Sequence, residues 1–257
     1  MIQTVGVTRY VTPLREGGSL PGIVEADDLG TYVWKFRGAG QGVRVLVAEV
    51  VVGGLAERLG IDTPRMVALD LDPEIARYEA DEEVQDLLNA SPGLNLGVDF
   101  LPGSFGYDGE VAAGADDAAA VVWLDALCAN VDRTWRNPNL LLWHGNLWVI
   151  DHGASLYFHH GWSASGVSDP ARFAAQPWDS TDHVLLGQVR DLSGTDARLT
   201  ELVTPDLLTE VVAQVPDAWL DEAATPGVAD AGRHRAAYVE FLSARLGTRQ
   251  WLPKVAG

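Results

Sequence analysis

The sequence predicts an α+β fold, with a sheet-rich first part that ends near residue 101 and a mainly helical second part. Runs of β-favouring residues alternate with turn signals in the first hundred residues. Apolar patterns of helical spacing follow from about residue 115. No internal repeat, low-complexity tract or obvious linker divides the 257 residues, a length ample for a sizeable core.

The composition favours a soluble, cytoplasmic protein that binds neither nucleic acids nor membranes. The chain has 36 acidic and 18 basic side chains, and a net charge of −18 repels phosphate backbones and anionic lipid surfaces. Its apolar runs are far shorter than the roughly 18 to 20 residues of a membrane span. The single Cys128 excludes a disulfide framework and is typical of a reducing compartment. The sequence does not indicate an oligomeric state.

Three strands are expected at the start of the chain. Thr4–Thr12 is rich in β-favouring residues, and the Gly-rich stretch Leu14–Gly22 is predicted to be a flexible loop. Ile23–Glu25 and Thr31–Phe36 are predicted to pair as a hairpin, because the turn-forming residues Asp27–Gly30 separate them.

A helix and two further strands complete the first part. Apolar residues recur at helical spacing from Val43, and Gly60 supplies a stop signal. Arg65–Leu71 is predicted to be a strand, and Pro73–Asn89 to be helical with acidic starts. Asn95–Leu101 is predicted to be a strand that ends before Pro-Gly.

Helices dominate the second part, with one hairpin between them. Ala115–Ala129 is an Ala-rich helical pattern, and Asn130–Asn139 is too rich in Asn and Pro to continue it. Leu140–Trp143 and Leu147–Ile150 are apolar runs separated by a short turn, which predicts a hairpin. Further helical patterns span His183–Arg190, Pro205–Gln214 and Arg233–Leu246.

One lysine holds a position suited to binding an anion. Sixteen of the 18 basic residues are Arg and Lys254 lies near the C-terminus, so Lys35 is the one lysine in the body of the chain. It lies near the end of a predicted strand, and Glu49 is the one carboxylate on the apolar stretch of the helix that follows. An ion pair between them would hold the ammonium in place. The alternative is that both are exposed surface residues.

Three oxygen-bearing side chains follow in a suggestive order. Asp132 and Asn137 are five positions apart in the polar loop, and Asp151 follows 19 positions after Asp132, at the end of an apolar strand. Phosphoryl transfer from ATP requires a cation on the phosphates, oxygen ligands for Mg²⁺, and a carboxylate that orients the accepting hydroxyl. Asp and Asn are also common in turns. Their joint order nevertheless matches that of a bilobal kinase.

The sequence around these residues resembles a known group of kinases. Asp132-Arg133, Asn137 and Val149-Ile150-Asp151-His152-Gly153 are similar to the Asp-Arg-His-…-Asn-Ile and Ile-Asp-Phe-Gly elements of the phosphatidylinositol kinase-like superfamily. Within that group the chain looks most similar to the HipA-like kinases, which residues 48–64 also resemble. The resemblance covers roughly residues 14–160.

The resemblance implies a bilobal protein-kinase-like fold, with a sheet-rich lobe over residues 1–101 and a helical lobe over residues 102–257. Lys35 would contact the α- and β-phosphates of ATP, with Glu49 as its partner. Asp132 would orient or deprotonate the acceptor hydroxyl, and Asn137 and Asp151 would bind Mg²⁺. The implied activity is Mg²⁺-dependent transfer of the γ-phosphate of ATP to a protein Ser or Thr, with a small-molecule hydroxyl as an alternative.

The resemblance also implies two segments around the nucleotide. The phosphates would be covered by a Gly-rich loop that contains Gly17, Gly18, Ser19 and Gly22. The adenine would stack at an inter-lobe hinge formed by Asp99, Phe100 and Leu101. A serine of this loop can be autophosphorylated in HipA-like toxins, which makes Ser19 a candidate regulatory site.

Two positions depart from the family pattern. Thr134 stands where the family usually has His, and His152 replaces the Phe of the Asp-Phe-Gly element. A catalytically silent kinase-like module that binds a nucleotide or a partner is therefore an alternative. The net charge of −18 would suit a basic partner.

Other interpretations have weaker support. Residues 38–43 partly match a dinucleotide-binding fingerprint but have Val in place of its third Gly. Five histidines gather near Asp151 without the spacing of a metal hydrolase, so a core with polar tips is favoured; they are His144, His152, His159, His160 and His183. No Gly-x-Ser-x-Gly segment indicates a serine hydrolase.

Overall fold

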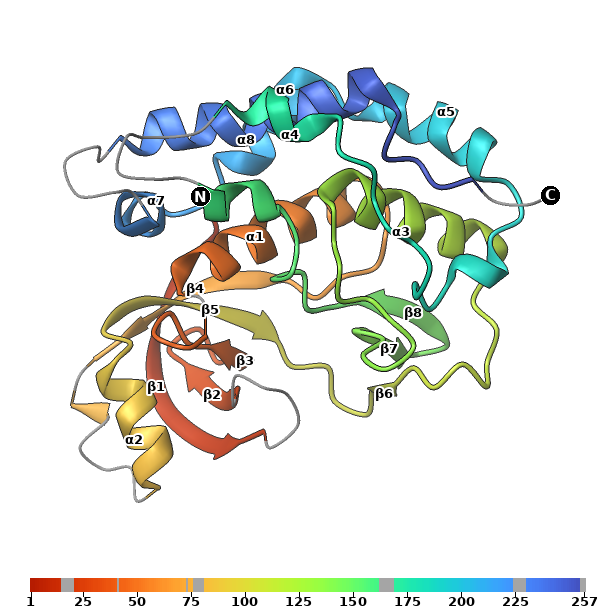
Figure 1. Cartoon of the computed structure of the whole chain (residues 1–257). Coiled ribbons are helices and arrows are strands. Elements are labelled where there is room, and N and C mark those ends of the chain that lie inside the picture. The colour runs from red at the N-terminus through yellow and green to blue at the C-terminus, as the bar shows by residue number, and fades with distance from the viewer. Residues whose placement is uncertain are drawn as a thin grey trace.

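A closed β-barrel forms the first part of the chain (Figure 1). The computed structural model describes residues 1–14, 21–40, 42–72, 74–75, 81–161, 169–223 and 230–254. The barrel strands are β1 (Thr4–Pro13), β2 (Gly22–Ala26), β3 (Thr31–Lys35), β4 (Met66–Leu71) and β5 (Gly93–Asp99). Their order is β1-β2-β3-β5-β4, and a parallel pairing of β1 with β4 closes the barrel. The predicted strands and the hairpin of β2 with β3 are confirmed, and the closed barrel excludes the doubly wound sheet of a dinucleotide fold.

Alternation along β3 gives its side chains two environments. Tyr32 and Trp34 are fully buried inside the barrel, so Val33 and Lys35 point to its outer face. Lys35 is therefore directed away from the barrel core by the same two-residue period that buries its neighbours.

Helix α1 (Val43–Arg58) follows β3 and is buried over almost its whole length. It runs between the barrel and the helices of the second part (Figure 1) and packs against α6 (Pro205–Val212) and α7 (Asp217–Ala223). Because it is covered on several sides, its sequence is apolar nearly all round. Glu49 is the exception among its buried residues and is only 3% exposed. The predicted helix and its end near Gly60, which has a φ of 75°, are confirmed.

A second small sheet lies beside helix α3 (Ala115–Cys128). It contains β6 (Phe105–Gly106), β7 (Leu140–Trp143) and β8 (Asn146–Val149) in that order. The polar loop between α3 and β7 starts where Ala129 adopts a left-handed conformation. The predicted helix, loop and hairpin are confirmed.

The remaining helices are α2 (Glu82–Asn89), α4 (Pro170–Ala174), α5 (Leu192–Leu202), α6 (Pro205–Val212), α7 (Asp217–Ala223) and α8 (Ala231–Thr248). Helix α2 begins only at Glu82, where the Asp81 side chain caps its N-terminus; Pro73 and residues 76–80 lie outside the described residues. None of the helices in the described parts of the chain has the length and apolarity to cross a membrane.

The prediction of a helix over His183–Arg190 was wrong. Only a 3₁₀ turn at Leu186–Gln188 forms there. Leu185 and Val189 are buried, so their apolar spacing reflects packing against the core rather than a helix. The helix that follows, α5, was not predicted; Asp191 caps it by accepting a hydrogen bond from the Gly194 N–H at 2.8 Å.

The interior of the barrel leaves no room for added volume at Gly97 of β5. A Cβ atom at this position would lie 2.8 Å from Leu69 Cγ and 2.9 Å from Val67 Cγ2. Gly97→Ala is expected to lower the free energy of unfolding by about 1–3 kcal/mol, measured by urea denaturation. Gly106→Ala is the matched control, because nothing lies within 4 Å of its Cβ position. Equal midpoints for the two variants would contradict this account of the barrel.

Candidate active site

Lys35, Glu49 and Asp151 converge although they are far apart in the chain. Lys35 Nζ lies 2.5 Å from Glu49 Oε1 and also donates to Asp151 Oδ1. The partners come from β3, from α1 and from the segment that follows β8. Burial acts to lower the pKa of Lys35, but the two carboxylates outweigh it and raise that pKa above its ordinary value. Lys35 is therefore a fixed ammonium.

Glu49 connects α1 to the segment that carries Asp151. Its Oε2 accepts a hydrogen bond from the His152 N–H at 2.8 Å, and its Oε1 accepts one from the Gly153 N–H at 3.0 Å. A Cβ at Gly153 would overlap the Val45 side chain and lie 3.2 Å from Glu49 Oε1, so this approach requires glycine. The sequence predicted the ion pair of Glu49 with Lys35 but not these two backbone contacts.

Asp151 lies two residues after the end of β8 and is held in a left-handed conformation with a φ of 54°. Asp is one of the few residues that tolerate this conformation. Its side chain is 51% exposed. The charge of Lys35 lowers the pKa of Asp151 below its ordinary value, so this carboxylate stays ionised. The site therefore holds a half-exposed, ionised carboxylate beside the Lys35 ammonium.

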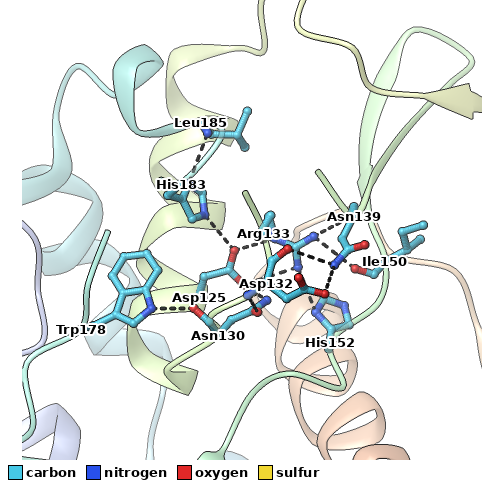
Figure 2. Close-up of polar contacts among 10 residues, drawn as sticks. All are labelled: Asp125, Asn130, Asp132, Arg133, Asn139, Ile150, His152, Trp178, His183 and Leu185. Carbon is cyan, nitrogen blue, oxygen red and sulfur yellow. Dashed lines mark hydrogen bonds and ion pairs between the residues drawn. The ribbon is translucent and has the colours of Figure 1, made fainter. Parts of the chain in front are cut away.

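Asp132 and Asn137 contact each other across the loop after α3. Asn137 Nδ2 donates to Asp132 Oδ2 at 2.8 Å. A residue not singled out from the sequence, Asn139, donates from Nδ2 to Asp132 O and to Asp132 Oδ2, both at 3.3 Å (Figure 2). In the sequence, Asn139 was marked only as one of several Asn residues in a polar loop. These amides fix the Asp132 carboxylate.

Asp151 and Asn137, the two predicted metal ligands, carry side-chain oxygen atoms of the kind that Mg²⁺ binds. This ion prefers oxygen ligands and is commonly held by one or two protein side chains together with substrate phosphates. Among the residues that the structure describes, no group of three or more His, Cys, Asp or Glu side chains is arranged to bind a metal. Three of the histidines noted near Asp151 in the sequence form hydrogen bonds with other side chains. His183 bonds to Asp125, His152 to Arg133, and His159 to His160 and Tyr238.

The predicted nucleotide-covering loop is only partly within the described structure. Gly17, Gly18 and Ser19 lie outside the described residues. Gly22 belongs to β2, where it pairs with Trp34 and where a Cβ would overlap the Tyr10 ring. The expectation that Gly22 lies in the loop was therefore wrong, because it is a strand residue under an aromatic ring.

The expected hinge begins at the end of β5. The Asp99 N–H donates to Arg65 O at 2.9 Å, and the Phe100 N–H donates to Thr31 O at 3.0 Å. Leu101 is buried, and its carbonyl accepts from Ser104. The strand predicted to reach Leu101 thus ends at Asp99.

Burial keeps His152 neutral and makes stability depend on pH. Burial and the charge of Arg133 lower its pKa to about 3. Because this value lies below the unfolded value of about 6.5, the stability contributed by neutral His152 is complete above pH 6.5 and is lost as pH falls toward 3. Between pH 7 and 4, wild type is expected to lose about 1–3 kcal/mol more unfolding free energy than His152→Asn. Urea denaturation at several pH values tests this, and parallel curves would contradict it.

Comparisons with known proteins identify the family and the fold. A family model described as HipA-like kinase matches residues 7–230. The crystal structure of the Helicobacter pylori proinflammatory kinase CtkA is similar with a TM-score of 0.55 and 12% identity, over 95% of this chain and 97% of that chain. A Golgi casein kinase with Mn/ADP bound gives a TM-score of 0.43 and 14% identity, over 98% of this chain and 73% of that chain. Among curated proteins no match is found. The likeness to CtkA shows a kinase-like α+β fold.

Proposed function

Since the chain belongs to the HipA-like kinase family, we propose that it transfers the γ-phosphate of ATP to a hydroxyl group, with Mg²⁺ bound by Asn137 and Asp151. The proposed acceptor is a Ser or Thr hydroxyl of a protein. We place the boundary between the two proposed lobes after Leu101. The first lobe contains the barrel and α1, and the second lobe is mainly helical.

The observation that carries the proposal is the convergence at Lys35. Its partners Glu49 and Asp151 are 14 and 116 residues away in the chain. A buried ion pair is costly to assemble and contributes little net stability compared with apolar packing. A fixed ammonium beside an exposed, ionised carboxylate is instead what binding of a triphosphate and its metal requires.

Each side chain then has a defined part in the proposed reaction. Lys35 neutralises charge on the phosphate oxygens, and Glu49 holds Lys35 and the segment that carries Asp151 in position. When bound, Mg²⁺ would neutralise charge on the β- and γ-phosphates. The Asp132 carboxylate, which Asn137 and Asn139 hold in place, orients the acceptor hydroxyl. The acceptor oxygen bonds to the γ-phosphorus, the bond from that phosphorus to the bridging oxygen of ADP breaks, and the hydroxyl proton passes to Asp132.

Labelled ATP tests the proposal against its alternatives. The protein is incubated with γ-labelled ATP, Mg²⁺ and an extract separated by ultrafiltration into macromolecules and small molecules. A protein Ser/Thr kinase labels Ser or Thr in the first fraction, and a small-molecule kinase labels the second. Asp132→Ala and Asp151→Ala should abolish either signal. A catalytically silent module would be stabilised against heat by ATP but would label neither fraction.

A further inference from the structure

Arg133 is almost completely buried, with 1% of its surface exposed. Its guanidinium makes five hydrogen bonds (Figure 2). Nε and Nη2 donate to the Asp125 carboxylate, at 2.6 and 3.4 Å. Nη1 donates to Asn139 O and, at 3.1 Å, to Ile150 O, and Nη2 also donates to His152 Nδ1 at 3.2 Å. These bonds engage all three nitrogens of the planar fork.

Asp125 of α3 is fully buried and holds this guanidinium in place. It also accepts from Asn130 Nδ2 at 2.9 Å and from His183 Nε2 at 3.0 Å. The Leu185 N–H donates to His183 Nδ1, so the proton of this imidazole lies on Nε2 and points at Asp125. Burial alone would raise the pKa of Asp125, but Arg133 and His183 lower it below its ordinary value. The buried carboxylate is thus a fixed anion.

The bonds of Arg133 connect the two chain segments that carry the carboxylates of the proposed reaction. Ile150 and His152, which it contacts, are the residues on either side of Asp151, and Arg133 itself directly follows Asp132. The Ile150 N–H also donates to Asn139 O, the carbonyl that Arg133 Nη1 contacts. One planar group therefore joins the loop that carries Asp132 to the segment that carries Asp151.

We infer that Arg133 is a positioning residue that sets the Asp132 carboxylate relative to the Asp151 carboxylate, and that Asp125 orients Arg133 for this task. This inference rests on the proposed function, because it assigns a role within that reaction. Phosphoryl transfer depends on positioning more than on covalent help from the protein. A misplacement of about 1 Å can lower the rate about 100-fold.

Arg133→Lys is the sharpest test, since lysine keeps the charge that Asp125 needs but lacks the planar fork. We expect kcat for ADP formation to fall about 100-fold, while KM for ATP stays within about threefold because Lys35 is untouched. Arg190→Lys, an exposed site, is the matched control and should keep the wild-type kcat. A role in folding alone would lower the thermal midpoint and the folded fraction but not kcat per folded molecule.

His152 provides a second test that keeps Arg133 intact. Asn offers an acceptor oxygen close to the position of His152 Nδ1, whereas Phe offers none. His152→Asn is expected to retain at least about ten times the kcat of His152→Phe. This pair decides the question if Arg133→Lys does not fold.

The outcomes separate the inference from the function on which it rests. A folded Arg133→Lys protein with wild-type kcat, or equal kcat for the two His152 variants, overturns the inference and leaves the proposed kinase activity standing. Wild-type protein that forms no ADP and labels no acceptor overturns both, and is seen before any variant is made. Loss of kcat with preserved KM supports the inference.

Discussion

Asp151→Asn is expected to lower ATP turnover by at least about 1000-fold while the protein remains folded. The substitution removes the negative charge that holds a metal ion, but it keeps the size and one oxygen of the side chain. Because Asp151 is 51% exposed and Lys35 keeps Glu49 as a partner, the fold does not depend on this carboxylate. Release of ADP and transfer of γ-label, measured over a range of Mg²⁺ concentrations, check the expectation.

Asp86→Asn is the control for this prediction. Asp86 is an exposed residue of α2, and the same change of charge at that place should leave turnover at the wild-type level. The assignment of Asp151 as a metal ligand would be contradicted if Asp151→Asn turned over ATP like Asp86→Asn at every Mg²⁺ concentration.

Glu49→Gln is expected to lower both stability and activity. Glu49 is 3% exposed and accepts from Lys35 and from the backbone N–H groups of His152 and Gly153. Gln has no charge for Lys35, and its amide places a donor against groups that are themselves donors. Breaking such a buried pair costs about 3 kcal/mol of unfolding free energy. Displacement of Lys35 and Asp151 is expected to lower kcat about 100-fold.

Urea denaturation and steady-state ADP formation measure the two effects of Glu49→Gln. Glu57→Gln is the matched control, since Glu57 is an exposed residue on the same helix. Its stability and kcat should stay close to wild type. If Glu49→Gln behaved like Glu57→Gln in both measurements, the connection of α1 to the Asp151 segment through Glu49 would be wrong.

The elements that the sequence predicted are those with strong local patterns. β1, the hairpin of β2 with β3, α1, α3 and the hairpin of β7 with β8 are marked by periodicity and by turn residues next to them. Helix α5 was missed because Leu192–Leu202 has many polar residues and few apolar ones, and it forms through packing on α3. The apolar spacing near Val184 and Leu185 was misleading, because an irregular segment that packs against the core can have apolar residues at the same spacing as a helix.

The candidate site was predictable where chain order carries the information. Lys35, Glu49, Asp132, Asn137 and Asp151 were selected by their order and spacing, and contacts between neighbours in this set are present in the structure. The bonds of Arg133 to Asp125 and His152 were not predictable. They depend on how α3, the loop after it and the segment after β8 meet in space, and burial of charged groups leaves no local sequence pattern.

A crystal structure with Mg²⁺ and a non-hydrolysable ATP analogue tests the central claim most directly. We expect phosphate oxygens within hydrogen-bond distance of Lys35 Nζ, a metal ion bound by Asn137 Oδ1 and the Asp151 carboxylate, and the γ-phosphate facing Asp132. An analogue bound away from Lys35, or a bound triphosphate whose metal contacts neither Asn137 nor Asp151, would contradict the account.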